Sequence, residues 1–365
     1  MRIKVILAII LGFIAVLAFQ QTTFAAITGN CVNCHTMHNS QNGTSMNFDN
    51  SPTPNEILLR SDCFGCHARG INQNIDPVTG SPQVSHTAAT DLAAGNFAYI
   101  LGNKGSGASD AKGHNVVDLG NSEDILTIPP TGRDPSHPDS VDNTNLRCAG
   151  RYGCHGTRPM AANSMFVEIK GAHHQNVDGK CDTASTVASS YRFLISVKGF
   201  EDSDWQATVT ANDHNEYFGD TAPMSYQCTN CHTGMGAGPI EPANQTISGF
   251  CGTCHSYFHA LEGIGGDTSS PFTRHPTDVI LPSSGEYSAY TTYSIEAPVA
   301  RTTVPSSPSL VVNPGTDVVM CLSCHASHAT DYPDILRWDY SDMIAGDSSK
   351  SGGCFTCHTQ KNQTP

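Results

Sequence analysis

Charged side chains are scarce in this 365-residue chain, since Lys, Arg, Asp and Glu together make up only 14% of it. Aromatic residues add 7%, and only two of them are Trp. So few large apolar side chains cannot fill the core of an ordinary domain of this length. Positive charge is the scarcest, because 19 basic residues face 33 acidic ones and the formal charge is -14. This deficit argues against nucleic acid or anionic membrane surfaces as partners.

Long apolar runs are missing except near the start of the chain. Arg2 and Lys4 precede an apolar run at 5–19, and small residues around Ala25 suit a cleavage point. This pattern predicts a secretory signal peptide over 1–25. The alternative is a membrane anchor, but the run is shorter than the roughly 20 residues of a typical span. We therefore expect an exported mature chain without a membrane span, extracellular or at the cell surface rather than periplasmic.

Cysteine and histidine are abundant, and most of them fall in one repeated pattern. Six segments contain Cys-x-x-Cys-His, the attachment motif of a c-type haem, in which both thiols bond to the haem and the His binds iron. A zinc ribbon needs no His at that position, and a disulfide framework does not repeat one. The predicted attachment residues are Cys31, Cys34, Cys63, Cys66, Cys228, Cys231, Cys251, Cys254, Cys321, Cys324, Cys354 and Cys357. The predicted proximal iron ligands are His35, His67, His232, His255, His325 and His358.

A seventh motif has an unusual spacing. Five residues, two of them Gly, separate Cys148 from Cys154, which His155 follows directly. A flexible loop can return the first thiol to the haem edge, so we expect a seventh haem with His155 as its proximal ligand. The alternative is a disulfide such as Cys148 to Cys181, with a singly attached haem or none. The prediction is therefore seven haems c, six at minimum, with Cys181 left over.

The chain also contains 33 Gly and 21 Pro, which favour loops over regular elements. We predict a mostly irregular fold with short helices and a few short strands, wrapped around a stack of c-type haems. The haem faces would supply the apolar surface that the side chains lack. Each attachment motif is expected to begin a helical turn.

Ten further histidines are available as second, distal iron ligands. Seven irons need seven such ligands, although a solvated surface His is the ordinary alternative for any single position. A Met ligand would raise the potential, but His is in better supply. His137 is the weakest candidate, and one ligand is expected from the pair at 173–174. The candidates are His38, His86, His114, His173, His174, His214, His259, His275 and His328.

Three of these candidates, His38, His259 and His328, lie three or four residues after a proximal His. Three residues span at most roughly 10 Å, which is too short to pass around a porphyrin edge. None of the three can therefore complete the iron of its own motif. If they are ligands, they serve neighbouring haems and hold those haems close together, which permits electron exchange.

The motifs divide the mature chain unevenly. We predict an N-terminal two-haem segment at 26–110, a central one-haem segment at 111–227 and a C-terminal four-haem segment at 228–365. In the central segment, 190–197 is expected to form a strand that pairs with 205–210. A repeat is also visible, because residues around the first two and the last two motifs share Cys-His-x-x-His, a Leu-Arg element and Cys-Phe. A shared two-haem module or convergence on the haem motif would each explain it.

Patterns of catalysis are missing. The sequence shows no Ser-His-Asp arrangement, no phosphate loop and no recognisable carboxylate pair. Acidic turns at 178–179 and 202–204 offer oxygen ligands for Ca²⁺, although such turns are ordinarily only solvated. A multihaem reductase of a small nitrogen or sulfur compound would need one iron with an open position. The surplus of His favours an electron carrier with closed irons over that alternative.

The sequence resembles the extracellular multihaem c-type cytochromes of metal-reducing bacteria. The likeness rests on the repeated attachment motif, the Cys-His-x-x-His variants, the stretches 146–150 and 190–194, and the doubled unit at 228–255. It implies bis-His low-spin haems in a nearly continuous stack, little regular structure and electron transfer. Some members of this group polymerise into conducting filaments. The spacing from Cys148 to Cys154 departs from the group's usual pattern.

Attachment motifs lie close to both ends of the mature chain, at Cys31 and Cys354. The terminal haems would then have little polypeptide to cover them, and apolar faces are better buried against another subunit. End-to-end contact that does not close a ring continues into a filament. The alternative is a monomeric shuttle. In either case we expect redox proteins or extracellular metal or mineral acceptors as partners.

Overall fold

The computed structural model describes residues 29–120, 123, 126–130, 141–159, 164–174, 178–208, 210, 212–221, 244–255 and 275–363. The predictions for the signal peptide, Cys228, Cys231, His137, His232 and His259 lie outside these residues.

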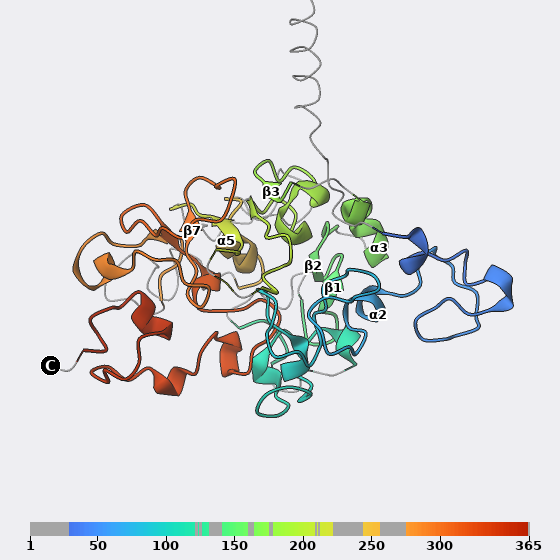
Figure 1. The fold of residues 1–365 in the computed structure, drawn as a ribbon, viewed down its shortest axis with the longest axis horizontal. Coiled ribbons are helices and arrows are strands. Elements are labelled where there is room, and N and C mark those ends of the chain that lie inside the picture. Colours follow the sequence, from blue (N-terminus) through green and yellow to red (C-terminus); the bar gives the residue numbers. More distant parts are fainter. Residues whose placement is uncertain are drawn as a thin grey trace, which may run out of the picture.

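The described chain is elongated (Figure 1). Its N-terminal part, drawn in blue, projects as an arm at one end, and its C-terminal part, in red, forms the opposite end. The middle of the chain packs between them. The first and the last attachment motifs therefore lie at opposite ends of the molecule.

Helical elements are short throughout the described chain, and none of them is long and apolar enough to cross a membrane. The α-helices are α2 (Cys63–His67), α3 (Met165–Glu168) and α5 (Ile247–Gly252). The 3₁₀ turns are η1 (Cys31–Asn33), η2 (Gln41–Gly43), η3 (Phe97–Tyr99), η4 (Asp110–Lys112), η5 (Val117–Leu119), η6 (Ala172–His174), η7 (Val187–Ser189), η8 (Tyr191–Phe193), η9 (Gly285–Ala289), η10 (Cys321–Ser323), η11 (Pro333–Ile335), η12 (Tyr340–Asp342) and η13 (Gly353–Thr356).

Most attachment motifs coincide with a helical turn, as predicted. The motif at 63–67 is itself α2, which Asp62 caps by accepting a hydrogen bond from the Gly65 N–H at 2.7 Å. The elements η1, η10 and η13 carry three other motifs, and α5 carries the first Cys of a fifth. The unusual motif at 148–155 is the exception, because it consists of two strands.

Two small sheets are present among the described residues. In the first, β1 (Arg147–Ala149) runs parallel to β2 (Gly153–His155). The second has the order β3-β4-β5-β7-β8-β6, and its neighbours are antiparallel except for the parallel pair β5 and β7. Its strands are β3 (Lys180–Cys181), β4 (Gly199–Phe200), β5 (Glu216–Phe218), β6 (Val279–Ile280), β7 (Ala300–Arg301) and β8 (Val318–Val319). The predicted fold class, mostly irregular with short helices and strands, is confirmed.

The predicted strand pair in the central segment is wrong. Residues 190–197 form η8 and turns, because Arg192 and Phe193 have φ of 49° and 59°, which no strand accommodates. Trp205 and Gln206 also have positive φ, at 58° and 63°, and sit in a turn. The alternation of bulky and small side chains suggested a strand, but hydrogen bonds to residues elsewhere in the chain determine the backbone conformation. The Arg192 guanidinium donates to the Asp202 carbonyl at 3.0 Å and holds the chain in this bend.

The main apolar cluster lies on the six-stranded sheet and contains Tyr191, Val197, Tyr217 and Met320. Cys154 of the unusual motif packs against it. The core of the polypeptide therefore directly adjoins an attachment site.

A buried polar network ties together the strands of the same sheet. The Glu216 carboxylate, which is fully buried, accepts hydrogen bonds from Arg301 Nε at 3.0 Å and from the Ser309 N–H at 2.6 Å. Arg301 also pairs with Asp317. A buried carboxylate with this many donors is stable only as a complete network, so the sheet depends on all of its members.

The two similar segments noted in the sequence share a local fold. In the first, the Thr36 N–H donates to the Leu58 carbonyl at 3.0 Å. In the second, the Ala326 N–H donates to the Ile335 carbonyl at the same distance. In both, the residues before the conserved-looking Leu-Arg pair fold back onto the first attachment motif. This common pairing favours a shared two-haem module over convergence.

Candidate haem-binding sites

We number the candidate sites in chain order by proximal His: site 1 at His35, site 2 at His67, site 3 at His155, site 4 at His232, site 5 at His255, site 6 at His325 and site 7 at His358. Site 4 lies outside the described residues.

Five proximal histidines face a second imidazole from a distant part of the chain. Their ring centroids are 5.7 to 6.2 Å apart. Two imidazoles on opposite sides of one metal need a centroid separation of about 6 Å, because each metal–nitrogen bond is about 2.0 Å long. The spacing therefore fits an iron between each pair. The pairs are His35 with His174, His67 with His173, His155 with His328, His255 with His114, and His358 with His275.

Hydrogen bonds orient most of these rings. A neutral imidazole that donates from Nδ1 leaves Nε2 free to bind a metal, and ligating histidines are commonly held this way. The Nδ1 acceptors are the carbonyls of Leu58 for His35 (3.0 Å), Pro82 for His67 (2.8 Å), Ser327 for His114 (2.7 Å), Arg192 for His155 (2.9 Å), Pro130 for His255 (3.0 Å), Pro276 for His275 (3.0 Å) and Asp334 for His325 (2.8 Å).

Burial favours the neutral form of several of the paired rings. It lowers the pKa of His173 and of His255 to about 4, and that of His328 to about 3, with nearby imidazoles adding to each shift. Burial also lowers the pKa of His67 and of His155. Neutral imidazole is the form that binds metal, so these rings are ready to ligate at neutral pH.

His86 and His214, two predicted ligand candidates, have no ring contact with any of the proximal histidines that the structure describes. The Nδ1 of His86 accepts the Ala88 N–H at 3.2 Å. His214 is fully buried, its Nε2 lies 3.1 Å from Glu216, and its ring stacks on Tyr293 with centroids 3.8 Å apart. In each of the two rings, a nitrogen already contacts another group of the protein. We therefore propose that both are residues of the protein core.

Replacing His214 by Met tests this assignment. We expect every haem to stay attached and the visible spectrum to stay unchanged, while the free energy of unfolding falls by about 1–3 kcal/mol because a buried partner of Glu216 is lost. Intact mass, absorption spectra and denaturant unfolding would measure these. His173→Met is the matched comparison and should alter the spectrum. A changed spectrum in His214→Met would make His214 a ligand.

Cysteines of neighbouring sites lie beside one another, which gives the order of the sites in space. Burial and then the Cys34 thiol of site 1 raise the pKa of Cys66 in site 2 to about 12. Burial and then Cys63 of site 2 raise the pKa of Cys148 in site 3. Thiols influence each other in this way only at short range, so sites 1, 2 and 3 are consecutive neighbours.

The series continues through the second half of the chain. Burial and then Cys254 of site 5 raise the pKa of Cys154 in site 3 to about 11. A hydrogen bond between Cys251 of site 5 and Cys321 of site 6 is the largest cause of the raised pKa of Cys251. Site 5 thus lies between sites 3 and 6.

The last link joins sites 6 and 7. Burial and then Cys354 of site 7 raise the pKa of Cys324 in site 6 to about 12. These contacts link the described sites in the order 1, 2, 3, 5, 6, 7, a series that we call the row. In Figure 1, α2, β1, β2 and α5, which carry residues of sites 2, 3 and 5, lie between the N-terminal arm and the C-terminal end of the molecule.

Site 3 shows how its long spacing is accommodated. The parallel pairing of β1 with β2 places Cys148 level with Cys154. Both thiols can therefore bond to the same edge of one haem. Gly153 makes this tight return possible, because a Cβ there would lie 2.5 Å from the backbone of Ala149. Cys181 is unbonded and 1% exposed in the six-stranded sheet. The geometry fits two thioethers at this site better than a disulfide.

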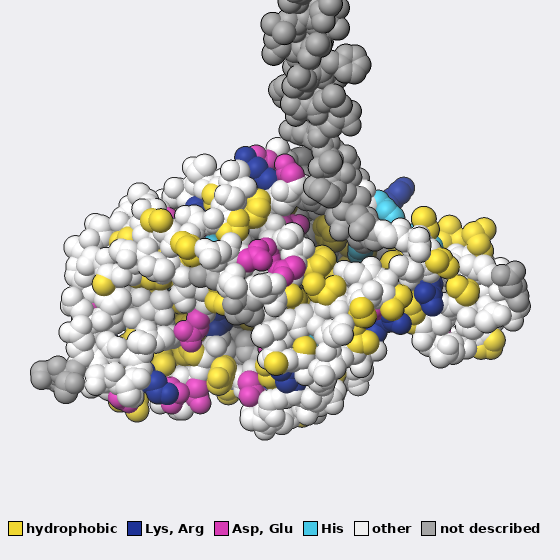
Figure 2. Space-filling model, in the orientation of Figure 1, with side chains coloured by type: hydrophobic (Ala, Val, Ile, Leu, Met, Phe, Trp, Pro, Cys, Tyr) yellow, Lys and Arg dark blue, Asp and Glu magenta, His cyan; other side chains and the backbone are white. Residues whose placement is uncertain are grey.

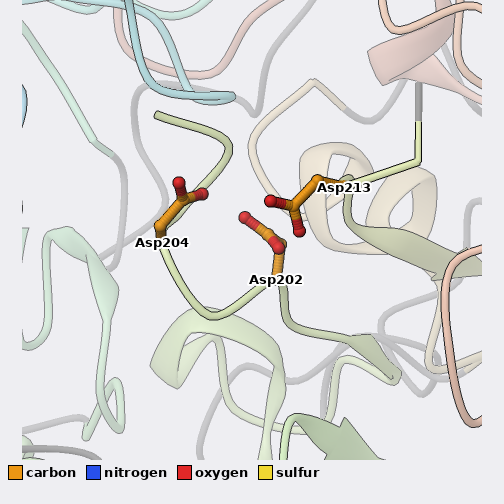
Figure 3. Close-up of side chains that lie close together, drawn as sticks. All are labelled: Asp202, Asp204 and Asp213. Carbon is orange, nitrogen blue, oxygen red and sulfur yellow. The ribbon is translucent and has the colours of Figure 1, made fainter. Parts of the chain in front are cut away.

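The acidic turn at 202–204 gains a third carboxylate from Asp213. Oxygens of Asp202, Asp204 and Asp213 lie within 4.8 Å of one another and point inward (Figure 3). Asp202 accepts the Gln206 N–H at 2.7 Å, and Asp204 accepts the Thr208 N–H at 3.0 Å. Burial and a hydrogen bond with Asp202 raise the pKa of Asp204. These hydrogen bonds stabilise the turn that carries the cluster.

Paired cysteines, facing imidazoles and an irregular fold define a multihaem c-type cytochrome. Residues 314–363, which contain sites 6 and 7, match the family described as doubled CXXCH motif. The chain is similar to the C-type cytochrome OmcS of Geobacter sulfurreducens, with 24% identity over 371 residues that cover 88% of this chain and 81% of that protein.

Two solved structures are also similar to this chain. The Outer Membrane Cytochrome S filament from Geobacter sulfurreducens has a TM-score of 0.46 and 17% identity, over 93% of each chain. The OmcS nanowires from Geobacter sulfurreducens, determined by cryo-electron microscopy, have a TM-score of 0.45 and 16% identity, over 93% of this chain and 92% of that one.

Proposed function

We propose that this chain carries electrons outside the cytoplasm along a row of bis-His haems, and that copies of it join end to end into a filament. The observation that carries the proposal is the row of facing imidazole pairs. Haem c, when bound, supplies a one-electron couple that the axial ligands tune. At sites 1, 2, 3, 5 and 7 the chain's own residues would hold the iron between two imidazoles. Seven haems are expected, at sites 1 to 7.

Short peptides join neighbouring sites in this row. His173 and His174 are adjacent in η6 and face sites 2 and 1, respectively. Both residues of this pair are therefore expected to be ligands, where one was predicted. Likewise, His328 faces His155 of site 3, although it lies three residues after His325 of site 6. Ligands this close in sequence hold their irons close in space, which favours electron exchange.

Two ring positions indicate how copies join. Among the described residues, no imidazole faces His325 of site 6. His38 is exposed on the N-terminal arm, faces no described imidazole, and has its Nδ1 2.8 Å from the Asn55 carbonyl, as an oriented ligand does. In the second repeat, His328 reaches from site 6 to site 3, which is two places back among the described sites. The same reach from site 1 passes beyond the subunit to site 6 of the copy before it.

The surface of the arm supports this contact. Three large apolar residues around site 1 are exposed to solvent. Their exposed fractions are 48% for Val32, 64% for Met37 and 49% for Leu58. Figure 2 shows hydrophobic side chains gathered on this arm. An apolar surface at one end of the row is better buried against another subunit than left in water. Redox proteins and extracellular metal or mineral acceptors are the partners that we propose for the assembled, exported protein.

The lack of an imidazole facing His325 among the described residues also supports a second candidate function. If no second imidazole reaches this iron, site 6 could bind a small molecule, as a reductase of a nitrogen or sulfur compound requires.

Carbon monoxide binding separates the two functions. We expect the native assembled protein, once reduced, to bind no carbon monoxide, because every iron is closed by two histidines. Absorption spectra before and after addition of the gas, together with the intact mass for the haem count, make the measurement. Rapid binding of carbon monoxide or nitrite by the intact assembly would instead support the reductase.

A further inference from the structure

The proximal ring of site 7 has a hydrogen-bond partner unlike those of the other sites. His358 Nδ1 lies 3.2 Å from Oε1 of Glu286, whose side chain is only 15% exposed. Every other Nδ1 bond found among the paired rings ends on a backbone carbonyl. One iron of the row is therefore set to have an axial His that donates to a carboxylate.

The neighbourhood holds this carboxylate in place. The Thr359 N–H donates to the Glu286 carbonyl at 3.3 Å, so the backbone next to His358 is tied to the same residue. The ring of Tyr287 packs against the His358 ring with its centroid 5.1 Å away. Lys361 Nζ lies 3.8 Å from the other carboxylate oxygen and balances its charge. Glu286 and His358 thus form a supported pair rather than a chance contact.

We propose that Glu286 is a positioning residue that gives site 7 a lower reduction potential than the sites whose histidines donate to carbonyls. A carboxylate accepts the Nδ1 proton more strongly than a carbonyl does, and this makes the imidazole a more basic ligand. A more basic axial ligand stabilises the oxidised iron over the reduced iron. The inference rests on the proposed ligation of a haem iron by His358.

Site 7 ends the row at the C-terminal side. A lower potential there makes it the last of the described sites to accept an electron and the first to give one up. Electrons that enter at this end therefore move energetically downhill into sites 6 and 5.

Variants of Glu286 test the inference in the haem-loaded protein. Glu286→Gln keeps an acceptor oxygen but removes the charge, so the lowest midpoint potential should rise towards the others while the remaining potentials stay unchanged. Glu286→Asp keeps the charge but withdraws it from Nδ1, and should give a smaller rise. Spectroelectrochemical titration measures the potentials. The low-spin electron paramagnetic resonance signal of one haem should shift in parallel, since it reports the strength of the axial ligand.

Asp342→Asn is the matched control, because Asp342 is acidic, lies in the same C-terminal region and pairs with Lys350 at 2.7 Å instead of with a ring. It should leave both readouts unchanged. An equal rise in Asp342→Asn, or no rise in Glu286→Gln with all haems attached, would overturn the role of Glu286. If His358→Met changed neither the spectrum nor any potential, the proposed ligation itself would fail.

Discussion

Replacing His38 by Ala is expected to convert filaments into single subunits whose site 6 binds carbon monoxide. His38 lies on the exposed arm with its Nδ1 2.8 Å from the Asn55 carbonyl, and His325 faces no imidazole among the described residues. Loss of a ligand that crosses the subunit boundary would remove the bond that joins copies and open one iron in each. Imaging and size measurement of unsheared material would report the first effect, and carbon monoxide difference spectra the second.

Ser40→Ala is the control for this experiment, because Ser40 is exposed on the same arm but carries no ring. It should leave both assembly and spectra intact. Filaments of normal length in His38→Ala, without any binding of carbon monoxide, would show that neither the subunit contact nor site 6 depends on His38.

Replacing Gly153 by Val should break the row in its middle. The new Cβ would lie 2.5 Å from the Ala149 backbone, so β1 and β2 could no longer pair and Cys148 would leave its place beside Cys154. We expect a haem at site 3 that is missing or held by a single thioether, and loss of nearly all conduction along the filament. Intact mass under denaturing conditions and conductance of single filaments are the measurements.

Cys181→Ala provides the comparison for that variant. Cys181 is the one cysteine outside the attachment motifs, and it is buried in the six-stranded sheet. Its removal should lower stability slightly and leave the haem mass and the conductance unchanged. A Gly153→Val protein with full haem mass and normal conductance would contradict the placement of site 3 in the row.

The attachment residues and proximal ligands of the sites could be predicted from the sequence. Which distal His pairs with which proximal His could not. Cys-x-x-Cys-His identifies attachment residues because the bonds involved span adjacent positions. A distal ligand, by contrast, comes from far along the chain: 139 positions separate His35 from His174, with which it pairs. The sequence constrained the pairing in one respect: a His three residues after a proximal His cannot reach the far side of the same haem. The position of His328 opposite His155, not opposite His325, agrees with this constraint.

Similar reasoning explains where the sequence and the structure point to different roles. His214 was predicted as a ligand from its loop-like sequence, and in the structure its Nε2 lies 3.1 Å from Glu216, two positions further along. The 190–197 segment alternates bulky and small residues like a strand. Its bend is set instead by Arg192, whose carbonyl orients His155 at 2.9 Å and whose side chain bonds Asp202. Such long-range demands from a site override local propensity.

A cryo-electron density map of the native, haem-loaded assembly would locate every iron and its ligands. We expect an iron between His35 and His174, His67 and His173, His155 and His328, His255 and His114, and His358 and His275, in one row with site 6 closed by His38 of the next copy. Irons held by other pairs of histidines, or sites arranged in separate groups rather than a row, would contradict it.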